Sequence, residues 1–246
     1  MDALKALLIA GADMNQARTD GATPLFIAAQ MDHVDALKAL LTAGADVNQA
    51  MTNGATPLFI AAQEGLVNAL KALLVAGADV NQARTNGATP LYIAAQKDHL
   101  DALKALLNAG ADVNQARTDG CTPLIIAAQK DHVDALKALL TAGADVNQAN
   151  VIGCTPLYIA AQEDHVDALK ALLVAGADAN QAITGGATPL IIASEVGNLE
   201  AVGLLLSAGA DKGAVTNEAY TAVPPGTTAL AVAGLNGHSA VFALLR

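Results

Sequence analysis

Aromatic residues and long apolar runs are scarce in this sequence. Only 2% of the 246 residues are aromatic and none is tryptophan, although 53% are hydrophobic. A membrane-spanning helix needs about 18 consecutive apolar residues, and polar residues, glycines and prolines interrupt every apolar stretch here. We therefore expect no membrane-spanning segment. Intrinsic disorder is excluded as well, because disordered chains are poor in apolar residues.

Basic residues and cysteines are also few. The 13 Lys and Arg residues face 23 Asp and Glu residues, which leaves a formal charge of −10. Nucleic-acid binding depends mainly on Lys and Arg neutralising phosphates, so we expect no nucleic-acid partner and attribute the charge to solubility. Two cysteines make no disulfide framework, and Met1-Asp2 opens a helical pattern rather than a signal peptide. An intracellular, reducing compartment is therefore favoured.

Alanine and leucine dominate what is present. The chain has 57 Ala and 34 Leu, which together make up more than a third of its residues. Both residues favour helix. The composition therefore predicts a soluble all-α protein whose core consists of small side chains.

The sequence repeats with a period of 33 residues. Each copy opens with a glycine and a common phrase, which reads GATPLFIAAQ from the first glycine and GCTPLIIAAQ from the fourth. Residues 21–53 and 54–86 are identical at 27 of 33 positions. The opening glycines are Gly21, Gly54, Gly87, Gly120, Gly153 and Gly186.

Each copy predicts two helices and a turn. Thr23 and Pro24 start the first helix, because a Thr hydroxyl caps an N-terminus and Pro is tolerated at the first helical position. The second helix runs from Val34 to Gly44, a glycine that suits a left-handed C-terminal residue. The segment 45–54 contains Asn-Gly and predicts a hairpin-like turn. The apolar stripe of the second helix consists of Val34, Leu37, Leu40 and Leu41.

The sequence contains six copies of T-P-L-x-I-A and six of G-A-D-x-N. It resembles the ankyrin-repeat family, because it also predicts two helices and a turn every 33 residues. The resemblance implies a solenoid of stacked helix-turn-helix units with β-hairpin-like loops. It also implies a concave groove, made by the hairpin tips and first helices, that binds another protein. One row departs from the family, which usually has His after T-P-L. We expect this row to pack between repeats, with contact to the groove as the alternative: Phe26, Phe59, Tyr92, Ile125, Tyr158 and Ile191.

The period divides the chain into one array over residues 1–246. Residues 1–20 form an N-terminal half repeat, 186–225 a repeat with an inserted loop at 212–225, and 226–246 a truncated repeat. The insert, which contains Tyr220, is either a drifted turn or a loop that contacts a partner. The full repeats cover 21–53, 54–86, 87–119, 120–152 and 153–185.

Histidines and cysteines recur at fixed positions without forming a chemical site. Equivalent residues lie one repeat apart, roughly 10 Å, so two imidazoles cannot share a metal ion. We assign the histidines to the start of the second helix. Cys121 and Cys154, also one repeat apart, lie beyond disulfide range and lack a nearby base, so we predict no catalytic residue, no metal and no cofactor. The histidines are His33, His99, His132 and His165.

We assign structural roles, rather than ligand binding, to the repeated acidic residues. The Asp of each G-A-D phrase, from Asp13 to Asp211, is expected to bond with the turn backbone. Asp and Lys three positions apart on the second helix, as in Asp35–Lys38 and Asp167–Lys170, contribute about 0.2–0.5 kcal/mol a pair.

The repeats differ mainly along two rows, and both are candidate partner-binding positions facing the groove, although exposed positions also drift freely. The hairpin tips carry Arg18, Met51, Arg84, Arg117, Asn150 and Ile183. The ends of the first helices carry Met31, Glu64, Lys97, Lys130, Glu163 and Glu195.

We therefore expect a non-catalytic, monomeric module that binds another protein. The alternative is a structural array that self-associates weakly, end to end, through its incomplete terminal repeats.

Overall fold

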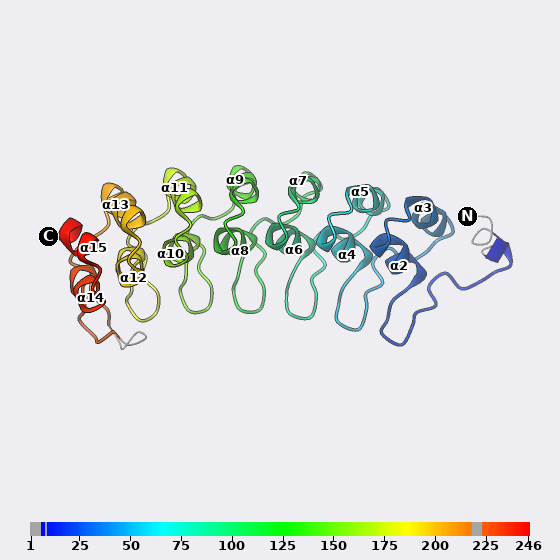
Figure 1. Cartoon of the computed structure of the whole chain (residues 1–246). Coiled ribbons are helices and arrows are strands. Elements are labelled where there is room, and N and C mark those ends of the chain that lie inside the picture. Colours follow the sequence, from blue (N-terminus) through cyan, green and yellow to red (C-terminus); the bar gives the residue numbers. More distant parts are fainter. Residues whose placement is uncertain (1–5, 8, 218–222) are drawn as a thin grey trace. The chain divides into compact units, whose positions relative to one another are not determined.

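The structure is a computed structural model that describes residues 6–7, 9–217 and 223–246. The chain divides into two compact units, Met1–Thr118 and Asp119–Arg246, and each is considered by itself. Each unit is a stack of helix pairs, in which every first helix packs on its own second helix and on the next first helix. In Figure 1 the first helices of a unit form one row and its second helices form another. The all-α solenoid architecture is thus confirmed.

The first unit holds three complete pairs among its described residues, namely α2 (Pro24–Gln30) with α3 (Val34–Thr42), α4 (Pro57–Gln63) with α5 (Val67–Val75), and α6 (Pro90–Gln96) with α7 (Leu100–Asn108). The second unit holds four, namely α8 (Pro123–Gln129) with α9 (Val133–Thr141), α10 (Pro156–Gln162) with α11 (Val166–Val174), α12 (Pro189–Val196) with α13 (Leu199–Ser207), and α14 (Ala229–Leu235) with α15 (Ser239–Leu245). No described helix has the length and hydrophobicity that crossing a membrane requires.

The first helices begin where Thr-Pro predicts. In α2 the Thr23 hydroxyl accepts a hydrogen bond from the N–H of Phe26 at 3.1 Å, and Pro24 occupies the first turn. The same cap recurs at Thr56 of α4 and Thr122 of α8. Because these threonines are only 1% exposed, the cap satisfies a donor that water does not reach.

The core consists of the first helices and one face of the second. In α4 every side chain from Pro57 to Ala62 is buried. In α3, Leu37 and Leu40 are buried as the stripe predicts, but Val34 and Leu41 are only half-buried. The row from Phe26 to Ile191 is 1–4% exposed throughout, so it packs in the core.

The turns are hairpin-like and join neighbouring repeats. The N–H of Met51 donates to the carbonyl of Ala55 at 2.9 Å, which closes the turn between α3 and α4. Asp46 accepts from the N–H of Asn48, as expected of the G-A-D aspartates. The Asn15 side chain, in turn, accepts from the N–H of Asp46 in the next repeat, and this bond recurs along the first unit.

The inserted loop at 212–225 is held at its base by hydroxyl groups. Thr216 and Thr227 both donate to the carbonyl oxygen of Pro224, at 2.8 and 2.7 Å. Tyr220 lies outside the described residues, so its expected contact with a partner stays a prediction.

A left-handed residue separates the two helices of each pair. Asp takes this position in four repeats, with φ of 52° at Asp32 and 56° at Asp131, and Gly takes it at Gly65, Gly197 and Gly237. Asp and Gly are among the residues that visit this conformation most readily. This role for the aspartate is additional to what the sequence pattern predicted.

The histidines occupy the N-cap positions of the second helices, so their assignment to the helix start is confirmed, although none makes a side-chain cap bond. His99 and His165 also join their repeat to the preceding one. The His99 Nε2 instead bonds to the carbonyl of Gln63 at 3.0 Å, and the His165 Nδ1 bonds to the carbonyl of Ala128 at 2.9 Å. These imidazoles make hydrogen bonds between repeats, which the aromatic rings and aliphatic groups of the row from Phe26 to Ile191 cannot make.

The residue in the left-handed position selects the carbonyl that the next histidine reaches. A Cβ on Gly65 would lie 2.7 Å from the His99 ring, so this ring uses space that only glycine leaves. His238 lies over Gly197 in the same way and bonds to the carbonyl two residues before that glycine, at Glu195.

We predict that Gly65→Ala destabilises the chain more than Gly77→Ala does. Both glycines have positive φ, which costs alanine about 1–2 kcal/mol, but a Cβ at Gly77 meets nothing within 4 Å. Gly65→Ala also displaces His99 from its bond, for about 0.5–1.5 kcal/mol more. Urea unfolding measures the difference, and equal losses in the two variants would contradict this role of His99.

Candidate functional site

The helix-end row is at the surface of both units. Met31 is 58% exposed, and Glu195 is half-buried. The other four helix-end residues are exposed: Glu64, Lys97, Lys130 and Glu163. Except for Glu195, which lies one residue before the end of α12, these residues follow directly after the last residue of a first helix. The exposed side chains among them are accessible to a partner.

The hairpin-tip row is less uniform. Arg18 is exposed, whereas Met51, Arg84 and Arg117 are half-buried. Ile183 is 9% exposed, so it offers little surface.

Asn150 is half-buried and already engaged. Its side-chain oxygen accepts from the N–H groups of Ile152 and Cys154, at 3.2 and 2.9 Å, which fixes its own turn. In the second unit, therefore, the tip positions serve the fold more than the surface.

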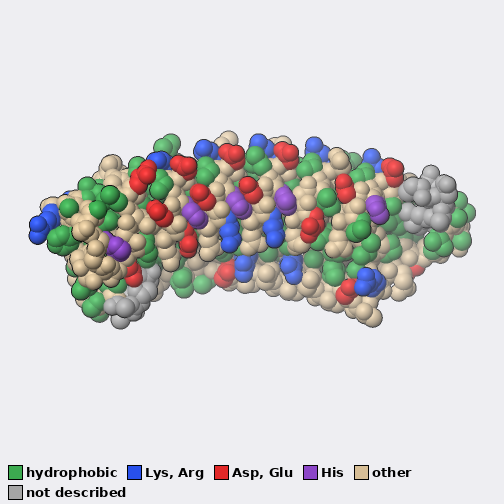
Figure 2. Space-filling model, viewed as in Figure 1, with side chains coloured by type: hydrophobic (Ala, Val, Ile, Leu, Met, Phe, Trp, Pro, Cys, Tyr) green, Lys and Arg blue, Asp and Glu red, His purple; other side chains and the backbone are tan. Residues whose placement is uncertain are grey.

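In the first unit, the hairpin-tip row borders a surface depression of about 310 Å³. Arg18 and Arg84 lie among its lining residues, together with Asp20 and the apolar side chains of Phe26, Met51 and Phe59. We call this depression the Arg18–Arg84 groove. Figure 2 shows two groups of basic side chains in this unit, one over its first helices and turns and another over its second helices.

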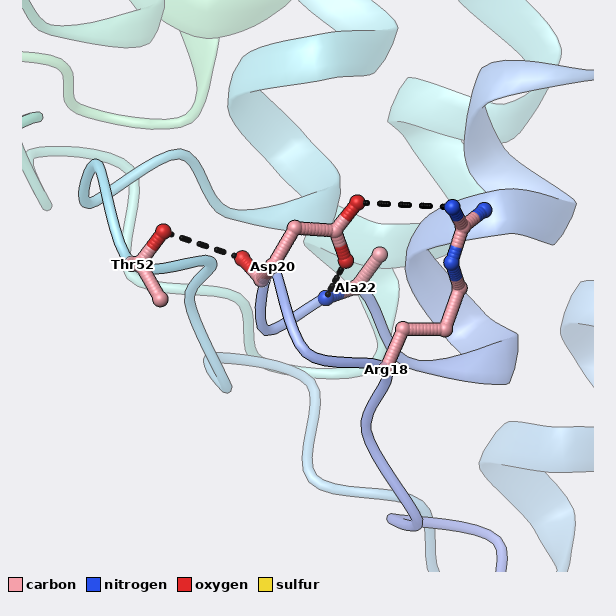
Figure 3. Close-up of polar contacts among 4 residues, drawn as sticks. All are labelled: Arg18, Asp20, Ala22 and Thr52. Atoms are coloured by element: carbon pink, nitrogen blue, oxygen red, sulfur yellow. Dashed lines mark hydrogen bonds and ion pairs between the residues drawn. The ribbon is translucent and has the colours of Figure 1, made fainter.

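The turn of residues 18–22 is rigidly built at one edge of the groove (Figure 3). The Asp20 carboxylate accepts from the N–H of Ala22 at 3.0 Å and lies 3.7 Å from the Arg18 guanidinium. The Asp20 carbonyl accepts from the hydroxyl of Thr52 at 3.1 Å. Because the Arg18 and Asp20 side chains are 69% and 43% exposed, this ion pair contributes little to stability.

Arg84 and Arg117 each cover an aromatic ring of the preceding repeat. The Arg84 guanidinium carbon lies 5.2 Å from the Phe59 ring centroid, and that of Arg117 lies 5.3 Å from the Tyr92 centroid. Both distances are within the range of a cation–π contact. Arg117 also donates to the Tyr92 hydroxyl at 3.1 Å, a bond that Phe59 cannot offer Arg84.

Two larger depressions lie between neighbouring second helices, one in each unit. The first, of about 750 Å³, is lined by α3 and α5, with Val34, Lys38, Lys71 and Val75 among its residues. The second, of about 800 Å³, has the corresponding residues of α9 and α11. Lysine, leucine and alanine recur there in equivalent places, so these surfaces differ little from repeat to repeat.

The cysteines do not form a disulfide, as expected. Burial, and then the charge of Cys121, raise the pKa of the Cys154 thiol to about 11. The thiolate, which is the nucleophilic form, is therefore rare at neutral pH. The described residues also contain no group of three or more side chains suited to hold a metal ion.

The sequence predicts that Lys170 pairs with a carboxylate of its own helix, but it pairs with a carboxylate of the next repeat. Lys170 Nζ lies 2.8 Å from the carboxylate of Glu200, on α13, and this bond is the main cause that raises the Lys170 pKa. Asp167 contributes only through its charge, so the predicted contact within α11 is corrected here.

We predict that Tyr92→Phe lowers the free energy of unfolding by about 1 kcal/mol, because Arg117 loses a hydrogen bond. Phe59→Tyr should raise it by a similar amount, since Arg84 gains the equivalent bond. Urea unfolding measures both changes. Phe59→Tyr combined with Arg84→Ala should bring no gain, and a gain there would assign the effect to the ring alone.

The repeat architecture agrees with comparison to known families. The family model of ankyrin repeats (3 copies) matches residues 1–84, 68–150, 136–216 and 157–246. A comparison with curated proteins finds no match. Ankyrin repeats are generally protein–protein interaction modules and are typically non-catalytic. Because the matches together span the whole sequence, this chain belongs to the ankyrin-repeat family.

Proposed function

We propose that this chain is a non-catalytic module that binds a partner protein through its turns and first helices. One observation carries the proposal. The residues that differ between repeats border the surface of the turns and first helices, whereas the residues that recur form the core and the bonds between repeats. Met51, Arg84 and the exposed Lys97 illustrate the first class, and Thr56 and Leu58 the second.

The surface of the second helices is less suited to selective binding of a partner than the surface of the turns and first helices. Its two depressions carry lysines in equivalent places of each repeat, such as Lys38 and Lys71, and the repeats vary there chiefly at the last residue of the second helix, which is Thr or Val. Discrimination between partners needs differences in contact free energy. A surface that repeats one pattern supplies fewer such differences than the turns do.

Capture from native lysate by two matched variants tests this assignment. Replacing Arg84, Lys97, Arg117 and Lys130 by Ala should abolish capture of the partner, with circular dichroism unchanged. Replacing Lys38, Lys71, Lys104 and Lys137 by Ala removes the same charge from the exposed side of the second helices. This control should still capture the partner. The reverse pattern would contradict the assignment and favour the second-helix side.

End-to-end self-association is the second candidate function, and the exposed end of the first unit supports it. A depression of about 370 Å³ there is lined by Pro24, Ile27 and Ala36 among others. The equivalent residues one repeat later, Pro57 and Ile60, are buried. In the second unit, Leu235 of α14 is 70% exposed and Leu244 of α15 is 42% exposed. If the first-unit face of one copy packs on the second-unit face of another copy, the contact is heterologous.

Sedimentation velocity over a range of concentrations tests this candidate. Self-association predicts a sedimentation coefficient that rises with concentration, and Ile27→Lys should suppress the rise by placing a charge in the contact. Val75→Lys is the control, because Val75 is 90% exposed on α5, away from this face. A strict monomer at the highest concentration would eliminate the candidate.

A further inference from the structure

The Arg84 side chain has hydrogen-bond donors that the fold does not use. Its Nε is buried and has no hydrogen-bond partner among the described residues. The Nε of Arg117, the matching residue one repeat later, is also buried and makes no hydrogen bond among the described residues. The two arginines differ at Nη, because Arg117 donates from Nη to the hydroxyl of Tyr92, whereas Phe59 beneath Arg84 has no hydroxyl. An acceptor from outside the chain can therefore take, at the Nη groups of Arg84, the place that the Tyr92 hydroxyl takes at Arg117.

The surroundings of Arg84 favour an anionic acceptor. The Arg18–Arg84 groove contains two guanidinium groups, and Asp20 is the one carboxylate that lines it. Asp20 is already engaged by the N–H of Ala22 and by Arg18. The groove is thus locally positive on a chain of formal charge −10. A guanidinium held flat on a ring keeps its edge N–H groups available, and these suit a carboxylate.

The lining of the groove is mixed, and its size suits a short peptide rather than an extended polymer. Phe26 and Phe59 line it but are only 4% and 1% exposed, whereas Met51 is half-buried and offers apolar surface. The volume of about 310 Å³ lies at the lower end of the range for ligand pockets. The negative charge of the whole chain opposes binding of a polyphosphate such as nucleic acid. A carboxylate next to an apolar side chain matches both the charged edge and Met51.

We propose that the Arg18–Arg84 groove binds an acidic segment of the partner protein, with an Asp or Glu carboxylate of that segment on the Arg84 guanidinium and a neighbouring apolar side chain over Met51. The proposal rests on the proposed function and specifies the chemistry of the partner. The Glu64 carboxylate next to the groove accepts from Gln63, a lining residue, at 2.9 Å, so the attraction for such a segment depends on the two arginines.

Fluorescence anisotropy with a labelled peptide of sequence Ala-Leu-Glu-Glu-Leu-Ala tests the proposal on the full chain. The same peptide with Gln in place of Glu is the control for charge. We expect the Glu peptide to bind at least about tenfold more tightly, and its affinity to fall with added salt. Equal affinity of the two peptides, or no saturable binding of the Glu peptide, would overturn the proposal.

Variants identify the group that the carboxylate contacts. Arg84→Gln should weaken binding of the Glu peptide by about tenfold or more. Lys71→Gln removes the same charge from α5 and should leave the affinity unchanged. Phe59→Tyr should also weaken binding, because its hydroxyl occupies the donors of Arg84 as Tyr92 occupies those of Arg117. Equal effects of Arg84→Gln and Lys71→Gln, or an unchanged affinity in Phe59→Tyr, would overturn the role of Arg84.

Competition separates a peptide site from a general anion site. Inorganic phosphate at constant ionic strength should not displace the Glu peptide, because phosphate lacks the apolar contact. Displacement would overturn a site for an acidic peptide. If the peptide fails to bind while the groove variant still loses capture of the native partner, the inference about acidic chemistry is wrong and the proposed function stands.

Discussion

Every helix in this protein depends on a neighbouring repeat, because none is long enough to be stable alone. The first helices have 7 or 8 residues and the second helices 7 or 9, whereas isolated helices are marginal below about 12–15 residues. The burial of α4 from Pro57 to Ala62 compensates for this shortness. The turns depend on neighbours in the same way, since the N–H of Asp46 bonds to the Asn15 side chain one repeat earlier. Packing and hydrogen bonding therefore fix most positions of the repeat.

This dependence also decides where the chain is able to carry function. A substitution at Leu58 or Thr56 disturbs a contact between repeats, because both side chains are at most 1% exposed. Lys97 and Glu64, by contrast, follow their helices at exposed positions and take part in no core contact. Chemical variety is thus confined to the helix ends and to those turn residues whose side chains reach the surface. The Arg18–Arg84 groove is lined by three such turn residues, Arg18, Met51 and Arg84.

The sequence predicts the features of the fold that depend on local chemistry and on the period. Thr23-Pro24 defines a helix start, and Gly44, with φ of 92°, takes the left-handed conformation expected after the second helix. The burial of the row from Phe26 to Ile191 also follows, because a side chain at one repeated position meets its equivalents in every stack. These features can be predicted without knowing the direction in which each side chain points.

Contacts between repeats were predictable only in part, because they depend on side-chain direction. Sequence reasoning placed His99 at a helix start, but its ring direction is set by Gly65 in the preceding repeat, 34 positions earlier. The contact of Arg84 with Phe59 spans 25 positions and recurs between Arg117 and Tyr92. A signal for it does exist in the sequence, since an arginine follows an aromatic residue by the same interval in both repeats. Recognising that signal requires knowing that each turn lies over the preceding first helix.

The difference between Phe59 and Tyr92 is the strongest physical argument for a ligand at Arg84. Residues 21–53 and 54–86 are identical at 27 of 33 positions, so repeats of this chain differ at few places. A tyrosine at Phe59 would accept from Arg84 as Tyr92 accepts from an Nη group of Arg117, and the site is 1% exposed and shaped for a ring. Because the buried Nε makes no hydrogen bond among the described residues in either arginine, the difference between the two repeats lies at Nη alone. A carboxylate that accepts from the Nη groups of Arg84 makes a charge-assisted hydrogen bond there, which is stronger than the bond of Arg117 to a neutral hydroxyl.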